Sequence, residues 1–385
     1  MANNNKNKIL NVPNLRFPEF CGEWKAERLN DIAILTKGAG ISKDQLSESG
    51  EPCILYGELY TKYKSEIIED VISKTNIPTD KLIKSKANDV LIPCSGETAV
   101  DIATARCVSS DNVLLGGDLN IIRLKHHDGS FMSYQLNGKR KYDIAKVAQG
   151  VSVVHLYGEH LKGIVTYNPQ IEEQKKIVGL LSLLDERIAT QNKIIEDLKK
   201  LKSAIRKRVF SLLKDEHTES FEINQLLAYE QPTTYIVAND EYSTDTTLIP
   251  VLTANKGFVL GYTDEDFGIY QKGECIIFDD FTMDAKYVTF PFKVKSSAIK
   301  ILTAKSCVNL RFMFEYLSYL ELKSEEHKRH YISEIASFVI EVPLLKRQNE
   351  IAFLMTSLDN KLTLEENVKV RYEDEKQYLL SQMFI

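Results

Sequence analysis

The feature that most constrains this chain is an internal repeat. Residues 169–210 align without a gap on residues 343–384 at a constant offset of 174, and eight aligned positions are identical. A repeated segment of this length indicates that one structural unit occurs twice. We therefore predict the order domain, helix, domain, helix, with cyclic pseudo-two-fold symmetry. The identical pairs are Pro169/Pro343, Gln174/Gln348, Ile177/Ile351, Leu180/Leu354, Leu184/Leu358, Asp185/Asp359, Lys202/Lys376 and Phe210/Phe384.

The repeated segment has the apolar spacing of a long amphipathic helix, with apolar residues recurring at steps of four and three. We expect Pro169 and Pro343 to open the two helices, because proline is tolerated in the first helical turn. Two such helices most simply bury their stripes against each other as a coiled coil, and two unrelated core helices are the alternative. The predicted helix–helix packing residues are Ile177, Leu181, Leu184, Ile188, Ile195, Leu198, Ile351, Met355, Leu358 and Leu362.

The sequence before each helix predicts a β-rich domain, so the expected fold class is α+β. Strand-like runs cover 32–35, 90–92, 120–124 and 164–167 in the first domain, and 247–252, 275–278, 287–294 and 298–302 in the second. The predicted parts are an N-terminal arm (1–23), a first domain (24–168), a central spacer helix (169–215), a second domain (216–342) and a C-terminal spacer helix (343–385).

The composition excludes several classes of protein. No apolar run reaches the roughly 18 residues that a membrane helix needs. The amino terminus lacks the features of a secretory signal, so we expect a cytoplasmic protein. The six cysteines include no CxxC pair, which argues against a zinc ribbon or a disulfide framework and favours free, mostly buried thiols.

Neither predicted domain is strongly basic. Residues 24–168 contain 18 basic and 18 acidic side chains, and residues 221–342 contain 11 basic and 18 acidic ones, a net charge of −7. Most nucleic-acid-binding domains carry a basic face. Charge alone therefore does not mark this chain as a nucleic-acid binder.

Motifs for catalysis or cofactor binding are weak. Gly38-Ala-Gly40 lacks the third glycine and the βαβ context of a dinucleotide site, and no GxxxxGK[ST] or HExxH motif occurs. The histidines have no partner at metal-ligand spacing, so no metal site is predicted. Glu173-x-Lys175 superficially matches a nuclease pair, but its place in the first turns of a helix indicates a solvated face. The aromatic residues from 312 to 319 most simply belong to the core.

Several of these segments resemble the specificity subunits of type I restriction-modification systems. Residues 12–24, VPNLRFPEFCGEW, look like the amino-terminal entry of that family, and residues 147–177 look like the close of a target recognition domain. Leu184-Asp185 continues the pattern into the spacer helix. The second half departs from it, because no counterpart of Gln149-Gly150 precedes Pro343.

The resemblance implies two target recognition domains that read the two halves of a bipartite double-stranded DNA sequence, and a chain that is not itself catalytic. It also implies two methyltransferase subunits and restriction subunits with motor and nuclease activity as partners. S-adenosylmethionine, ATP and Mg²⁺ are then expected in those partners and no cofactor in this chain. The spacer helices are expected to set the gap between half-sites, on the scale of the roughly 34 to 36 Å turn of B-DNA.

The candidate DNA-binding residues lie in polar loops after predicted strands, where side chains suited to base edges would be exposed. Two alternatives stay open: a coiled-coil scaffold whose domains bind proteins, and a self-contained restriction or methylation enzyme. The candidates are Lys37, Tyr56, Glu58, Ser95, Glu97, Thr98, Gln149 and Ser152 in the first domain, and Thr253, Asn255, Lys256, Asp280, Thr282 and Lys286 in the second.

Overall fold

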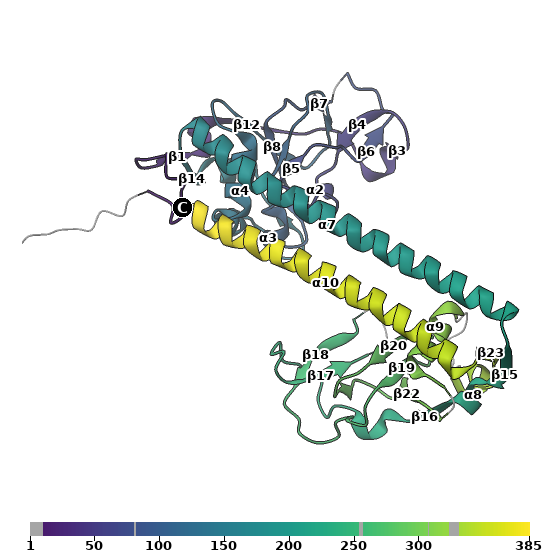
Figure 1. The fold of residues 1–385 in the computed structure, drawn as a ribbon. Helices are drawn as coiled ribbons and strands as arrows, with labels where there is room; N and C mark the ends of the chain where they lie inside the picture. The colour runs from purple at the N-terminus through teal and green to yellow at the C-terminus, as the bar shows by residue number, and fades with distance from the viewer. Residues whose placement is uncertain (1–10, 81, 254–256, 307, 323–330) are drawn as a thin grey trace, which may run out of the picture. The chain divides into compact units, whose positions relative to one another are not determined.

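The fold is that of a computed structural model, which describes residues 11–80, 82–253, 257–306, 308–322 and 331–385. The chain divides into two compact units (Figure 1). The first unit comprises Met1–Asn192 with Asn367–Ile385, and the second comprises Lys193–Glu366. Each unit therefore contains part of both helices of the repeat.

The first unit is a mixed α+β domain. Its central sheet has the strand order β2-β12-β8-β10-β5, a second sheet has the order β3-β6-β4-β11-β7, and β1-β14 and β13-β9 form two-stranded ladders. The strands are β1 Lys25–Arg28, β2 Ala33–Lys37, β3 Leu46–Ser47, β4 Glu51–Ile54, β5 Ile67–Ile68, β6 Ser73–Thr75, β7 Ile83–Lys84, β8 Asp89–Pro93, β9 Ser95–Gly96, β10 Arg106–Val108, β11 Leu114–Leu115, β12 Leu119–Leu124, β13 Val154–His155 and β14 Val165–Asn168. The short helices are α1 Leu29–Ile32, α2 Glu58–Thr61, α3 Ala99–Ile102, α4 Gly129–Asn137, α5 Lys141–Val147 and α6 Gly158–Lys162.

The second unit repeats the core of the first with fewer elements. Its main sheet has the order β16-β22-β19-β20, beside a sheet β18-β17-β21 and a ladder β15-β23. The strands are β15 Thr218–Glu222, β16 Leu227–Glu230, β17 Ile249–Leu252, β18 Val259–Thr263, β19 Cys275–Asp279, β20 Ala285–Val288, β21 Lys293–Val294, β22 Ile299–Ala304 and β23 Val339–Pro343. Its short helices are α8 Ile223–Leu226 and α9 Leu310–Tyr319.

The two units share one topology. The antiparallel order β2-β12-β8-β10 in the first corresponds to β16-β22-β19-β20 in the second, and the ladder β1-β14 corresponds to β15-β23. In the described part of the second unit, nothing corresponds to the β13-β9 ladder or to α5. The predicted α+β fold with a repeated unit is confirmed, and the second copy of the domain is the simpler one.

The two long helices are α7, Ile171–Leu212, and α10, Leu345–Met383. Each begins two residues after its proline, rather than at it. Pro169 follows β14 and Pro343 is the last residue of β23, so each proline ends a strand. The carbonyl oxygen of each proline accepts a hydrogen bond from a glutamine side chain in the first helical turn, Gln174 Nε2 at 2.8 Å and Gln348 Nε2 at 2.9 Å.

One predicted strand is divided in the structure. The run 287–294 forms the end of β20 and the separate strand β21, with Pro291 between them. Proline has no N–H to donate to a sheet ladder, so a continuous strand is disfavoured at this position.

The helices of the repeat pack within each unit. In the first unit, Ile177 and Leu181 of α7 join Leu380, Met383 and Phe384 in one buried cluster. In the second unit, Phe210 of α7 and Ile351 and Met355 of α10 share a core with α9. Phe312 is fully buried there, so the prediction that this aromatic segment belongs to the core is confirmed.

Within the described residues, no helix combines the length and the apolar character that crossing a bilayer requires. The described cysteines are all free thiols, of which Cys21 is exposed and Cys53, Cys94, Cys107 and Cys275 are buried. Cys307 lies outside the described residues.

Candidate nucleic-acid interface and helix junctions

The first unit brings three separate segments together in one loop cluster, defined here as Lys37, Ser95–Thr98 and Gln149–Tyr157. The β13-β9 ladder pairs His155 with Ser95, and the backbone N–H of Gln149 donates to the carbonyl of His155 at 2.9 Å. Lys37, at the end of β2, places its Nζ 5.2 Å from the ring centroid of Tyr157. Six of the eight candidates of the first domain therefore lie in one place.

The tip of this cluster is a protruding loop. The side chain of Val151 is 96% exposed and that of Val153 is 52% exposed, and Ser152 between them is also exposed. Gly150 has φ +122°, and a Cβ there would lie 2.1 Å from the carbonyl oxygen of Val153. Only glycine fits this turn, which positions Gln149 and Ser152 on the surface.

Other members of the cluster stabilise its loops. Ser95 is buried, and its hydroxyl donates to Asp118 Oδ2 at 3.2 Å. Thr98 is the N-cap of α3, where its Oγ1 accepts from the backbone N–H of Asp101 at 3.1 Å. Glu97 and Thr98 are exposed, so they can still reach a ligand, whereas Ser95 acts on loop shape.

Tyr56 and Glu58 lie outside this cluster. Tyr56 is half-buried beside a cavity of about 650 Å³. Glu58 is 5% exposed; its carboxylate accepts from the backbone N–H of Leu55 at 3.0 Å, from Lys62 at 2.6 Å and from Ser73 at 2.5 Å. These bonds occupy both oxygens, so Glu58 is corrected to a structural role.

In the second unit the candidates are dispersed. Thr253 is half-buried, Thr282 is exposed, and Lys286 is half-buried on β20. Asp280 is 1% exposed, lies 3.3 Å from Lys300 Nζ and accepts from the backbone N–H of Tyr331 at 2.8 Å. Asp280 is therefore also corrected to a structural role, because its carboxylate is directed into the domain. Asn255 and Lys256 lie outside the described residues.

Sequence reasoning missed the aromatic part of the first-unit loop cluster. The rings of His155 and Tyr157 stack with centroids 6.0 Å apart and an interplanar angle of 12°, and Tyr157 is 44% exposed. His160 meets the same tyrosine edge-on at 5.5 Å. The sequence did contain a signal for this aromatic group, because three rings occur within the six residues 155–160, directly after the loop that contains Gly150.

The predicted packing residues lie on the inner side of the long helices. Among the predicted set, the buried residues are Ile177, Leu181, Leu184, Ile195, Ile351, Met355 and Leu362, and the half-buried ones are Ile188, Leu198 and Leu358.

Gln174 and Gln348, identical in the repeat, have the same function in both units. Gln174 Oε1 accepts from the backbone N–H of Asp128 at 2.9 Å, and Gln348 Oε1 accepts from that of Asn309 at 2.8 Å. Asp128 and Asn309 are the N-caps of α4 and α9. Each glutamine therefore ties the start of a long helix to a preceding strand and to a domain helix.

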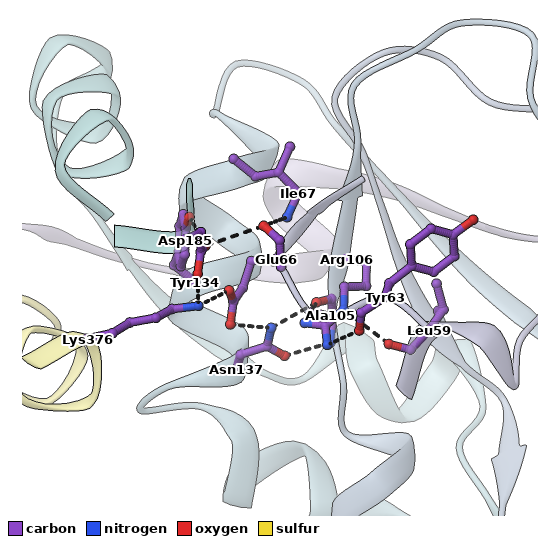
Figure 2. Close-up of polar contacts among 11 residues, drawn as sticks. Leu59, Tyr63, Glu66, Ile67, Ala105, Arg106, Tyr134, Asn137, Asp185 and Lys376 are labelled. Atoms are coloured by element: carbon purple, nitrogen blue, oxygen red, sulfur yellow. Dashed lines mark hydrogen bonds and ion pairs between the residues drawn. The ribbon is translucent and has the colours of Figure 1, made fainter. Parts of the chain in front are cut away.

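The identical aspartate and lysine of the repeat form a polar junction in each unit. In the first-unit junction (Glu66, Tyr134, Asp185 and Lys376), Lys376 Nζ lies 2.5 Å from Asp185 Oδ1 and 2.5 Å from Glu66 Oε2 (Figure 2). The hydroxyl of Tyr134 donates to Asp185 Oδ2 at 2.7 Å. Burial raises the pKa of Asp185, and the Glu66 carboxylate adds to this effect, while Lys376 opposes it.

The second-unit junction consists of Lys202, Arg206, Arg311, Glu315 and Asp359. Lys202 and Arg311 both bind Asp359. The fully buried Glu315 accepts from Arg206 Nε at 2.7 Å and from Arg311 at 2.5 Å. Burial acts to raise the pKa of Asp359, but the hydrogen bonds from Lys202 and Arg311 outweigh it, and the net pKa is lowered.

Ion pairs also fasten the chain before each domain to the first turn of a long helix. In the first unit, Arg16 makes a bidentate contact with Glu173, 2.7 Å at each end, and Glu173 also accepts from Trp24 Nε1 at 3.2 Å. In the second unit, Arg347 binds Glu216 at 3.0 Å. Glu173 is 2% exposed, so the prediction that it lies on a solvated face is wrong.

Glu173 and Arg347 occupy equivalent positions of the repeat. The acidic and the basic partner of the pair are therefore exchanged between the units, while the contact itself is kept.

Within the described residues, no group of three or more histidine, cysteine or carboxylate side chains is arranged to hold a metal ion.

The chain belongs to the family of the type I restriction modification DNA specificity domain, whose model matches it twice, over residues 22–200 and 215–372. Each match covers one β-rich region together with most of the long helix that follows it.

Curated relatives carry related names. The chain is 40% identical over 189 residues, 44% of its length, to the type I restriction enzyme EcoR124I/EcoR124II specificity subunit of Escherichia coli. It is 29% identical over 214 residues, 55% of its length, to the MjaVIII specificity subunit of Methanocaldococcus jannaschii. These matches span about half of those relatives, 46% and 47% of their lengths.

Solved structures support the fold. The S subunit of the type I restriction-modification system from M. genitalium aligns with a TM-score of 0.64 over 97% of this chain and 99% of that one, at 17% identity. A chain from a study of complex assembly and conformational transition of the type I R-M system aligns with a TM-score of 0.55 over 94% of this chain and 97% of that one, at 12% identity.

Proposed function

We propose that this chain is the DNA-recognition subunit of a type I restriction-modification complex and reads a bipartite duplex target, one half with each unit. The observation that carries the proposal is the duplication: the family model matches twice, and the two matched regions fold with the same strand order. A duplicated reader suits a target with two half-sites, as dimeric DNA-binding proteins suit palindromes.

In the first unit we assign base reading to the loop cluster. Gln149 has an amide suited to adenine, Lys37 a cation suited to guanine or phosphate, and Val151 a methyl surface suited to thymine. All three are exposed. For the second unit we retain Thr253, Asn255, Lys256, Thr282 and Lys286 as candidates.

Catalysis is assigned to partner chains. We propose that two methyltransferase subunits, using S-adenosylmethionine, and restriction subunits, using ATP and Mg²⁺, assemble with this chain, which holds no cofactor of its own. The near-neutral first domain and the acidic second domain support this arrangement, because phosphate neutralisation by lysine and arginine supplies most non-specific DNA affinity. Partner subunits would contribute that affinity.

The test is a map of N6-methyladenine across the genome of cells that express this chain with a methyltransferase partner, compared with cells lacking only this chain. We expect a two-part motif with a fixed gap to be methylated only when the chain is present. Unchanged methylation despite a purified complex would contradict the proposal and favour a protein-binding scaffold.

The residue assignment is tested in the same cells. Gln149→Ala is expected to change or relax one base of one half-site, because the adenine-matched amide is lost, while the other half-site is read as before. Glu58→Gln serves as the control, since its carboxylate is directed into the domain. A motif unchanged by Gln149→Ala would remove that residue from the interface.

A further inference from the structure

The first unit contains a second polar cavity, away from the loop cluster, that nothing above uses. Its volume is about 480 Å³, and it lies between the end of α4, the start of α5 and the last turns of α10. The polar residues that line it include Glu66, Thr104, Arg106, Asn137, Lys139 and Lys141. Three of these six side chains are cations.

Arg106 is the deepest cation of this cavity, at 8% exposure. Its guanidinium donates only to backbone carbonyls, those of Leu59 at 3.1 Å, Tyr63 at 3.0 Å and Ala105 at 3.3 Å (Figure 2). Among the described residues, no carboxylate lies within ion-pair distance of it. Buried charges are normally paired, so this guanidinium leaves a positive potential at the base of the cavity.

Lys141 adds to that potential. Its side chain is half-buried, and its Nζ makes no hydrogen bond or ion pair with any described residue. Burial lowers the pKa of Lys141, and repulsion from Arg106 lowers it further, while Asp101 and Glu66 act in the opposite direction. An anion bound between Lys141 and Arg106 would relieve this repulsion.

The one carboxylate that lines the cavity is already engaged. Glu66 Oε2 lies 2.5 Å from Lys376, and Glu66 Oε1 accepts from Asn137 at 3.4 Å (Figure 2). Lys139, at the rim, is exposed. Lys376 is shared with Asp185, but even with Glu66 counted as a full negative charge, Arg106, Lys139 and Lys141 give the lining of the cavity a net positive charge.

We propose that this cavity is a phosphate-binding site, with Lys139 and Lys141 as the ligating side chains and Arg106 as a fixed positive charge behind them. The location favours a backbone phosphate of the bound duplex. Helix α5 starts at Lys141 and leads into Gln149 of the loop cluster, and α3 packs against both α5 and β13. A phosphate contact here would fix the register of the first unit on its half-site without reading sequence.

The same chemistry would also accept a phosphate that is not part of DNA, either the free ion or the phosphate group of a larger molecule. The ring of Tyr142, which lines the cavity and is 67% exposed, leaves room for the larger molecule. The experiment therefore has two arms, one with duplex DNA and one with inorganic phosphate.

Three variants of the full chain are compared with the wild type. Lys141→Ala removes the half-buried ligand, and Lys139→Ala removes the exposed one at little risk to folding. Lys86→Ala is the control. Lys86 is exposed and precedes the first residue of β8, whereas Ser95 of the loop cluster follows the last residue of that strand.

In the DNA arm, each variant is assembled with a methyltransferase partner, and its affinity for a target duplex is measured across a salt series. Loss of one phosphate contact is expected to reduce the slope of log K against log salt by about one, equally for every sequence. Between 50 and 200 mM salt, the affinity of the variants should therefore fall by a factor about threefold smaller than the factor for the wild type. Lys86→Ala should keep the wild-type slope.

In the second arm, thermal unfolding of the full chain is followed in inorganic phosphate and in chloride at equal ionic strength. Phosphate stabilises many proteins through exclusion from their surface, so the informative quantity is the difference between wild type and variant. A larger phosphate effect in the wild type and Lys86→Ala than in Lys139→Ala and Lys141→Ala would support a site for free phosphate.

The outcomes separate the sources. A changed salt slope with equal phosphate effects assigns the site to the DNA backbone, and the reverse assigns it to a free phosphate. No change in either arm, or the same change in Lys86→Ala, overturns the proposal. The DNA arm rests on the proposed function and the phosphate arm does not; a wild-type complex that fails to bind DNA contradicts that function and leaves the phosphate arm to decide.

Discussion

The same aspartate and lysine occur in both units, but their surroundings have opposite charge balance. In the first-unit junction one lysine serves two carboxylates, Asp185 and Glu66. In the second-unit junction two carboxylates, Asp359 and Glu315, are served by Lys202, Arg206 and Arg311. The pKa of Asp185 is raised and that of Asp359 is lowered. The repeat thus conserves a contact, and the domain around each contact decides its electrostatic character.

Helices α4 and α9 supply part of this difference, and Glu66, which precedes β5, supplies another part in the first unit. Tyr134 in α4 donates one neutral hydroxyl to Asp185, whereas Arg311 in α9 brings a full charge to Asp359 and Glu315 brings a second acceptor. The lesson is that a duplicated helix pair can stay the same while the two domains change around it. The following predictions test this difference between the two units.

The largest effect is expected from Glu315→Gln. Glu315 is fully buried and pairs with two arginines, so its loss leaves buried cations uncompensated and destabilises the second unit by about 3–5 kcal/mol. Hydrogen exchange of β19 and β22 measures the second unit, and that of β8 and β12 measures the first. Equal loss of protection in both units would contradict the assignment of the junction to one unit.

The two identical lysines, Lys376 and Lys202, are expected to contribute unequally to the stability of their units. Lys376→Met leaves Asp185 and Glu66 without their shared cation and should cost about 3 kcal/mol in the first unit. Lys202→Met leaves Arg311 on Asp359 and should cost about 1 kcal/mol in the second. The same exchange experiment compares them, and a larger effect for Lys202→Met would reverse our view of the charge balance.

The exchanged ion pairs at the helix starts should differ in the same sense. Glu173→Gln removes a buried carboxylate that accepts from Arg16 and Trp24, and is expected to cost about 2 kcal/mol. Arg347→Gln breaks a pair that is about one-third exposed on each side, 37% and 32%, and should cost less than about 1 kcal/mol. Denaturant unfolding followed by the fluorescence of Trp24 measures the stability lost in Glu173→Gln, and hydrogen exchange of β19 and β22 measures that lost in Arg347→Gln. Equal losses of stability would refute the ranking.

The smallest and most specific effect is the pH dependence. Because the folded pKa of Asp185 lies above its ordinary value of 3.8, this group stabilises the first unit progressively as pH falls from neutral toward 3.8. The folded pKa of Asp359 lies below 3.8, so its contribution is present above 3.8 and is lost as pH falls through the lowered value.

Asp185→Asn and Asp359→Asn remove these two dependences separately. On acidification, the stability of the wild type relative to Asp185→Asn should rise, and its stability relative to Asp359→Asn should fall. Unit-resolved hydrogen exchange between pH 6 and pH 3.5 measures both, after correction for the intrinsic exchange rate. Slopes of the same sign would contradict the opposite charge balance of the junctions.

Much of the fold follows from the sequence. The apolar steps of four and three predicted the helices α7 and α10, and Pro169 and Pro343 placed their starts within two residues of the observed ones. The strand-like runs before the helices marked the central strands β8, β12, β19 and β22. Local periodicity suffices here, because a helix or a buried strand presents its apolar face at a fixed repeat. Pro291 was the visible reason why one predicted strand is two.

The candidate site was less predictable. The polar-loop argument selected Gln149, Ser152, Glu97 and Thr98 one by one as DNA-binding candidates, and only the tertiary structure brings them into one loop cluster. The same polar-loop argument also selected Glu58 and Asp280, which are buried in hydrogen-bond networks. Their partners, Ser73 and Tyr331, are 15 and 51 residues away, so no local pattern shows them.

By itself, the sequence determined the duplication, the two amphipathic helices, the β-rich domains between them and the family resemblance. The tertiary structure alone decided that Asp185 meets Lys376, 191 residues away, and that Arg16 meets Glu173. It also decided that two equivalent aspartates have opposite pKa shifts. The physical reason is that periodicity is a property of neighbouring residues, whereas burial and charge pairing depend on groups that only the folded chain brings together.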